Sequence, residues 1–163
     1  MDYKDTVKIM LNQGLIKKQK VDFSQIKALL LRAQKDIVAA KANLKIDEEV
    51  TYNYAYLAML ICGRSIVFMK GYRSVDGQQH KTIIELSGDV LGEKFKNIIK
   101  KFDRMRRKRN QFTYDPFLPV SKIEAENALK TAEEFVKIVL KLVQKENPQL
   151  WKYNRADTHF LLK

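Results

Sequence analysis

The sequence has few of the residues that build disulfides, metal sites and flexible segments. Among its 163 residues are one cysteine, Cys62, two histidines, His80 and His159, six glycines and three prolines. A single thiol excludes an internal disulfide and a zinc site made of several thiolates. The two histidines stand in no HExxH motif or carboxylate cluster, so we expect no metal and no cofactor. Cys62 lies in the apolar segment YLAMLICG and is expected to be a small core residue.

Long apolar runs are also missing. The sequence has no stretch of ~18 uncharged apolar residues and no cleavable apolar segment at its start. We therefore expect no membrane association, no export and a cytoplasmic protein. A hydrophobic content of 45% is enough for one ordinary core. The expected organisation is one helical domain over residues 1–163, with its core at about 22–145, a short helix within 1–20 and a tail at 147–163.

Helix start and stop signals recur along the chain, and no strand-length alternation separates them. Ser24 and Asp47 are expected N-caps, and Ser121 with Glu124 forms a capping box. Gly63 would allow another helix to approach the apolar segment around it. The expected helices, in chain order, cover about Thr6–Asn12, Ser24–Leu44, Asp47–Gly71, His80–Leu86, Leu91–Phe112 and Ser121–Pro148. Together they predict an all-α, up-and-down bundle of four to five main helices, with the Asp47–Gly71 helix most buried.

The basic segment Lys94–Tyr114 stands out. Residues 94–109 hold nine Lys or Arg against one acid, Asp103, hence a net +8 of the formal +12 of the chain. Such a density of cations favours a polyanionic partner. At helical spacing the apolar residues share one side of this segment, whereas the cations Lys100, Lys101, Arg104, Arg107 and Lys108 share the other.

Arg106 and Arg109 continue the apolar stripe and so face inward. A buried guanidinium without a partner costs several kcal/mol. For Arg109 the candidate partners are Asp103, a carboxylate elsewhere, a second subunit, or a phosphate in a pocket.

A family resemblance rests on four features. An aromatic-rich buried helix is followed by the GYR turn at residues 71–73, by His80-Lys81, and by the ending FDRMRRKRNQFTYDP. Together they resemble HEPN domains (higher eukaryotes and prokaryotes nucleotide-binding) over about residues 22–145, in a subgroup with an RNxxxY ending in place of RxxxxH. Arg109 then matches the motif arginine, Asn110 the polar residue after it, and Tyr114 the position of the histidine.

The resemblance implies a compact helical bundle that dimerises, and in many members a metal-independent endoribonuclease of toxin–antitoxin, defence or RNA-processing systems. In such chemistry a base activates the ribose 2′-hydroxyl and an arginine stabilises the charge on phosphate. Histidine suits that role near neutral pH, whereas a tyrosine phenol, which titrates at ~10, is a weak base. Tyr114 therefore argues against the usual chemistry. Its structural alternative is a packed aromatic whose hydroxyl has a hydrogen-bond partner.

Three functions remain. The first is an RNA- or nucleotide-phosphate-binding module, in the setting of a diverged toxin–antitoxin or defence component. The second is an active ribonuclease in which Arg109, Asn110 and Tyr114 act at a dimer cleft. The third is a non-catalytic subunit that binds an acidic protein such as an antitoxin. The candidate phosphate ligands are Arg106, Arg104, Arg107, Lys108, Lys101, Arg73, His80 and Lys81.

Other roles are open for several of these residues. His80 with Arg73 and Lys81 meets Arg109 if its helix folds over the basic segment; otherwise His80 is a surface residue. Tyr52 and Tyr56 share a face and either stack on a base or pack in the core.

Overall fold

The computed structural model describes residues 2–75, 77 and 79–151. Six α-helices, two short strands and two 3-10 turns make up this part of the chain. In chain order they are α1 (Tyr3–Asn12), β1 (Ile16–Lys18), α2 (Phe23–Asn43), α3 (Glu48–Met69), β2 (Tyr72–Ser74), α4 (Gln79–Leu91), η1 (Glu93–Phe95), α5 (Lys96–Tyr114), α6 (Lys122–Glu146) and η2 (Pro148–Trp151). The predicted all-α class is confirmed. Most of the predicted tail lies outside the described residues.

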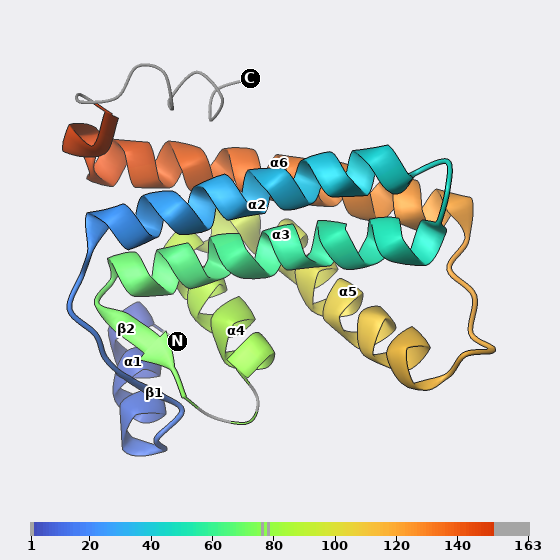
Figure 1. The fold of residues 1–163 in the computed structure, drawn as a ribbon. Helices are drawn as coiled ribbons and strands as arrows, with labels where there is room; N and C mark the ends of the chain where they lie inside the picture. Colours follow the sequence, from blue (N-terminus) through green and yellow to red (C-terminus); the bar gives the residue numbers. More distant parts are fainter. Residues whose placement is uncertain (1, 76, 78, 152–163) are drawn as a thin grey trace.

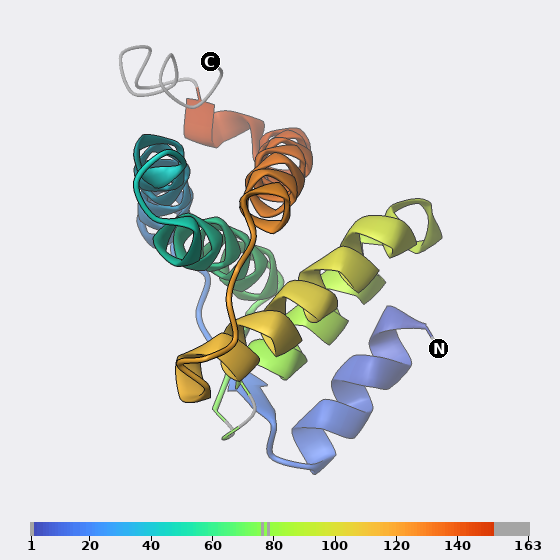
Figure 2. The same ribbon diagram turned by 90° about the vertical axis from the view of Figure 1, so that its right-hand side faces the viewer.

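The long helices α2, α3 and α6 run alongside one another and contact each other as a group of three, and α4 and α5 cross beneath them (Figure 1). Helix α1 lies beside α4 (Figure 2). Helix α3 contacts α2, α4, α5 and α6 and is buried on most sides, so its prediction as the central element is confirmed. Cys62 is fully buried, as expected of a small core residue, and this burial raises the pKa of its thiol.

Gly63 lies where α3 packs tightly against α4. A Cβ atom placed there would lie 2.6 Å from Ile83 Cγ2 and 3.0 Å from Ser87 Oγ. Because only a residue without a Cβ fits this contact, the prediction of a close helix crossing at Gly63 is confirmed. The contact fixes how near α4 lies to the face of α3.

Helix ends follow the capping signals with one exception. Asp47 Oδ1 accepts from Val50 N at 2.9 Å, and both hydrogen bonds of the Ser121–Glu124 capping box form. The prediction of Ser24 as a cap is wrong: α2 begins at Phe23, and Asp22 Oδ1 accepts from both the backbone N and Oγ of Ser24, at 2.9 and 2.7 Å. A carboxylate is the stronger acceptor and takes the capping position.

Two further boundaries differ from the sequence-based expectation. Helix α4 continues to Leu91 rather than stopping near Leu86, because Gly88 lets it pack against Ile99. The basic helix α5 begins at Lys96, after η1. It ends at Tyr114, and Asp115 is extended, as the following Pro116 requires.

A small antiparallel sheet was not predicted. β1 pairs with β2, with Lys17 opposite Arg73, and Ile16 is buried. Strands of three residues are too short to show alternation, and their pairing partners lie far apart in the chain. The sheet joins α1 to the segment between α3 and α4. Within the described residues, no helix combines the length and the apolarity needed to cross a membrane.

Candidate nucleic-acid interface

Helix α5 has the two sides predicted from its sequence. Ile98, Phe102, Met105 and Phe112 are buried against the rest of the bundle. The cations Lys100, Lys101, Arg104 and Arg107 are exposed, and the inward-facing Arg106 and Arg109 are half-buried. The helix therefore carries one outer row of charges and a second, inner pair of arginines.

Lys108 is an exception on the outer side. Its Nζ donates to the Pro119 carbonyl oxygen at 3.2 Å and forms an ion pair with Glu124 Oε1 at 3.2 Å, and its side chain is only 19% exposed. The prediction that it lies on the solvated face is wrong, because the α5–α6 connection folds back over it. Lys108 joins α5 to that connection and to α6.

The two inner arginines have different partners. Arg106 Nε donates to Asp103 Oδ1 at 2.8 Å, and Arg107 Nη2 donates to Asp103 Oδ2 at 2.7 Å. Burial raises the pKa of Asp103, but the hydrogen bonds and charges of Arg106 and Arg107 outweigh it and hold that pKa below its ordinary value. Arg109 Nε donates at 3.3 Å to Asn53 Oδ1 on α3. Since an amide is neutral, this bond orients Arg109 without cancelling its charge.

His80 reaches the same region from the first turn of α4. Its Nδ1 lies 2.9 Å from the hydroxyl oxygen of Tyr56, which is fully buried. The pKa of His80 is lowered, first by burial and then by the positive charges of Arg109, Arg64 and Arg106. Burial raises the pKa of Tyr56, so its phenol stays protonated. The imidazole is therefore neutral near pH 7, and its ring is held by a neutral partner.

These side chains form one cluster, which we call the central site. Its members come from three helices: Asn53, Tyr56 and Arg64 from α3, His80 from α4, and Arg106 and Arg109 from α5. The sequence-based hypothesis that His80 meets the Arg109 region is supported by these interactions. Arg64 is exposed, and its positive charge acts on His80. The roles of Asn53 and Arg64 were missed; their spacing of three helical turns, which puts both on one side of α3, was the available signal.

Tyr52 and Tyr56 are core residues. They are 5% and 0% exposed. The ring of Tyr52 meets Phe112 edge-on with centroids 5.5 Å apart, and that of Tyr56 lies 5.9 Å from Phe102. Neither ring is open to a base, so the packing interpretation is correct and the stacking one is wrong. Tyr56 nevertheless contributes its hydroxyl to the central site.

Two grooves run along the exposed side of α5. The groove toward α4 has a volume of about 540 Å³ and is lined by six cations, Lys81, Lys96, Lys100, Arg104, Arg106 and Arg107, against Glu85 and Asp103. The groove toward α6 has about 840 Å³ and is lined by Lys101, Arg104, Arg107, Lys108 and Lys130 against Glu124 and Glu134. Both are net positive and share Arg104 and Arg107. The α4–α5 groove also shares Arg106 with the central site.

Three other predicted residues lie outside these grooves. Arg73 is exposed on β2 opposite Lys17, and among the described contacts none connects it to His80 or Arg109. Asn110 is half-buried one residue beyond Arg109. Tyr114 is 86% exposed, so the prediction that it packs in the interior is wrong. Phe112 is the last buried residue of α5, and the helix extends past its packing partners.

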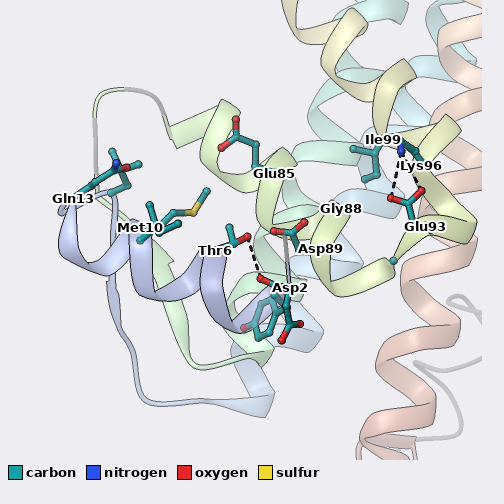
Figure 3. A pocket seen from close by; sticks show the side chains of 14 residues that line it. Asp2, Thr6, Met10, Gln13, Glu85, Gly88, Asp89, Glu93, Lys96 and Ile99 are labelled. Atoms are coloured by element: carbon teal, nitrogen blue, oxygen red, sulfur yellow. Dashed lines mark hydrogen bonds and ion pairs between the residues drawn. The ribbon is translucent and has the colours of Figure 1, made fainter.

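A third depression has the opposite charge. It has a volume of about 660 Å³ between α1 and α4, and Figure 3 shows the carboxylates of Asp2, Glu85, Asp89 and Glu93 around it. Lys96 contributes the one cation of its lining, and its Nζ is bonded to Glu93 at 3.1 Å. In the part of the chain that the structure describes, no three His, Cys, Asp or Glu side chains are grouped to hold a metal. A phosphate ligand would be repelled here, whereas both grooves beside α5 are net positive.

One comparison with known proteins matches the region that holds the central site, and two others find nothing. A search of curated proteins and a search of solved structures find no match to the chain. A family model, described as HEPN domain, matches residues 26–143. The match begins in α2 and ends in α6, so it includes every helix of the central site. Because it covers more than half of the sequence, the chain belongs to the HEPN domain family.

Proposed function

We propose that this protein is an RNA- or nucleotide-phosphate-binding module. The observation that carries the proposal is the state of Arg109: its Nε donates to the neutral amide of Asn53, and its positive charge lowers the pKa of His80, second only to burial of that imidazole. Clustered cations with fixed positions and little counter-charge favour an anion. Membership of a family of nucleotide-binding or ribonuclease-type modules agrees with this ligand class.

The grooves beside α5 extend this role to a polymer. Arg106 belongs both to the central site and to the α4–α5 groove, and Arg104 and Arg107 belong to both grooves. A nucleic-acid backbone lying along α5 would meet these cations in sequence, and each phosphate contact would release a condensed counterion. Lys81 and Lys101 line one groove each and are proposed as further phosphate ligands. Lys108 is assigned instead to holding the α5–α6 connection, because its charge is paired.

A second candidate function is metal-independent cleavage of RNA, favoured by the bond between His80 and Tyr56. A neutral imidazole with a fixed ring can accept the proton of the ribose 2′-hydroxyl at Nε2, provided that Nδ1–H donates to the Tyr56 oxygen. The 2′-oxygen then bonds to the adjacent phosphorus and the bond to the 5′-oxygen breaks, that oxygen taking a proton from water. Arg109 would stabilise the charge on the phosphate oxygens. In this mechanism His80 replaces the histidine absent from position 114.

One experiment separates these candidates. Wild type, Arg109→Ala and His80→Gln are incubated with mixed RNA in the absence of divalent metal, and both cleavage and retained complex are read from one gel. The binding module predicts complex without cleavage, weakened by about tenfold or more in Arg109→Ala, since a charge-assisted hydrogen bond contributes ~1.5–3 kcal/mol. The ribonuclease predicts cleavage that both substitutions abolish.

Arg73→Ala is the matched control, because it removes the same charge from an exposed position outside the central site. If it weakens binding as much as Arg109→Ala, net charge alone accounts for the interaction and the central site is not the binding site. Absence of both binding and cleavage in the wild type would refute both candidates. The remaining function would then be recognition of an acidic protein partner.

A further inference from the structure

The acidic depression between α1 and α4 combines an apolar floor with a rim of carboxylates. The floor includes Ile9, whose side chain is 42% exposed, and the half-buried Leu15 and Ile99. An apolar side chain left open in a depression forgoes the stabilisation that contact with another apolar group would give. The rim carries the carboxylates of Asp2, Glu85, Asp89 and Glu93 (Figure 3). The depression therefore presents apolar contact and negative charge together.

Part of this negative charge has no counter-charge. Within the described residues, no lysine or arginine forms an ion pair with Asp2 or Asp89, which both line the depression. Glu85 lies 3.8 Å from Lys81, and both of these side chains are about half exposed, so the pair contributes little. The chain as a whole has a formal net charge of +12. An acidic surface on such a chain is not explained by its composition.

The depression lies partly outside the matched domain. The family match begins at residue 26, whereas α1, which forms one wall of the depression, covers Tyr3–Asn12. Helix α1 makes its main contacts with α4 and β1 and lies apart from the three long helices (Figure 2). The wall that α1 supplies is therefore a feature of this chain beyond the matched residues.

The basic helix α5 of a second copy would match only half of this surface. Its exposed side carries cations, and the core takes its apolar side chains, Ile98, Phe102, Met105 and Phe112. Such a helix would neutralise the carboxylates and leave Ile9 uncovered. An occupant that satisfies both parts needs an apolar stripe flanked by Lys or Arg, which describes a basic amphipathic helix. Helices of this kind bind by laying their apolar side in a groove.

We propose that the acidic depression docks a basic amphipathic helix of a partner protein. Its apolar side chains would contact Ile9, Leu15 and Ile99, and its cations would pair with Asp2 and Asp89. Helix α1 has 10 residues and is ~15 Å long, so about three turns of a partner helix would cover the depression. The proposal does not rest on the proposed function.

The docked helix would lie beside the nucleic-acid interface without filling it. The acidic depression is on the α1 side of α4 and the α4–α5 groove is on the other, and the two share only Glu85, Lys96 and Ile99 among their lining residues. Opposite charges keep their ligands apart, because the depression repels phosphate and the groove repels cations. The depression is thus a second interaction surface, separate from the central site.

The probe for the test is a fluorescent peptide of about 14 residues, four helical turns, made of Leu and Lys with the leucines on one side. Fluorescence anisotropy without RNA gives Kd at low and high salt. Wild type is expected to bind the probe. Ile9→Ser should weaken binding roughly fivefold at either salt concentration. Asp2→Asn and Asp89→Asn should each weaken it about two- to fivefold at low salt, and less at high salt.

NMR locates the bound probe. The amides of Gly88 and Gly92, which line the depression, should shift when the probe is added, whereas that of Gly71 should not. Two matched variants lie outside the depression: Val38→Ser removes an apolar side chain that is 55% exposed on α2, and Glu126→Gln removes an exposed carboxylate of α6. Both should bind like wild type. A probe with the same residues in scrambled order should bind more weakly.

Several results would overturn the proposal. They are absence of binding to the wild type, equal binding of the scrambled probe, and equal weakening by the matched variants. Loss of self-association in Ile9→Ser without the probe, read by light scattering, would make a second copy the occupant instead. If Ile9→Ser lowers the urea midpoint, the two Asp→Asn variants still decide the question, because they remove no apolar contact. RNA is absent throughout, so none of these results bears on the proposed function.

Discussion

Replacing Gly63 by alanine tests whether the close contact between α3 and α4 sets the geometry of the central site. The new Cβ would lie 2.6 Å from Ile83 Cγ2, whereas non-bonded carbon atoms sit ~3.5–4.0 Å apart. The two helices must therefore separate locally by about 1 Å. Because a β-branched side chain in a helix has one strongly preferred rotamer, Ile83 cannot simply rotate away. The displacement falls on α4, which also carries His80.

The expected cost combines two opposing effects. Overpacking of a core contact destabilises by ~1–3 kcal/mol, and alanine in place of glycine stabilises a helix by ~0.8–1 kcal/mol. The free energy of unfolding should therefore fall by about 0–2 kcal/mol. His80 precedes Ile83 by one turn of α4, so the same movement stretches the 2.9 Å contact between Tyr56 and His80 toward ~4 Å, which is too long for a hydrogen bond. The central site then loses its neutral, oriented imidazole.

Urea unfolding measures the stability change, and NMR titration of the His80 imidazole measures the change at the site. We expect the pKa of His80 to rise toward its ordinary value, because burial is the main cause of its lowering, and we expect RNA binding to weaken. Gly88→Ala is the matched control in α4: its Cβ would lie 3.2 Å from Ile99 Cγ2, a milder overlap that a shift of a few tenths of an ångström relieves. A wild-type imidazole pKa and wild-type RNA affinity in Gly63→Ala would refute the reasoning.

Three further predictions concern charge and assembly. His80→Gln should remove an acid sensitivity of the folded protein. Burial and the charges of Arg109, Arg64 and Arg106 lower the pKa of His80, so the folded state binds a proton less readily than the unfolded chain. The stability of the wild type therefore falls as the pH drops below ~6.5. Urea midpoints at about pH 7 and 5.5 check this, and an equal decline in both proteins would contradict it. Asp103→Asn should lower the free energy of unfolding by about 1–2 kcal/mol at low salt, and by less at high salt, because salt screens the attraction between Asp103 and its arginines. A loss that does not depend on salt would indicate a packing effect instead. Light scattering at micromolar concentration should give twice the chain mass, because the family resemblance implies a homodimer. A monomer would exclude a site shared between subunits.

Local signals in the sequence predicted most of the fold. The caps Asp47 and Ser121 are set by side chains within three residues of the backbone they bond, and Pro116 ends α5 through its direct neighbour. Such signals need no knowledge of tertiary structure. The β1–β2 sheet and the length of α4 do need it, since they depend on Ile16 finding a buried position and on Gly88 meeting Ile99.

The candidate site was predictable only in part. Helical periodicity placed Arg106 and Arg109 on the inner side of α5, and both are half-buried. Periodicity within one helix cannot name partners on another, so the contacts of Arg109 with Asn53 and of His80 with Tyr56 came only from the packing of α3, α4 and α5. The same limit explains the wrong placement of Lys108, which depends on how the α5–α6 connection folds back.

The choice of partners in the central site agrees with the proposed binding role better than with a structural polar network. A network that serves stability pairs a half-buried arginine with a carboxylate, because charge compensation reduces the cost of burial. Arg109 instead has the amide of Asn53, and His80 has the phenol of Tyr56. Each neutral partner fixes an orientation and leaves the field of the arginines in place. Asp103, a neighbouring carboxylate, is bonded to Arg106 and Arg107. Preorganised donors with an uncancelled field are what an anionic ligand requires, so the same contacts that cost the folded protein stability would supply the affinity for a phosphate.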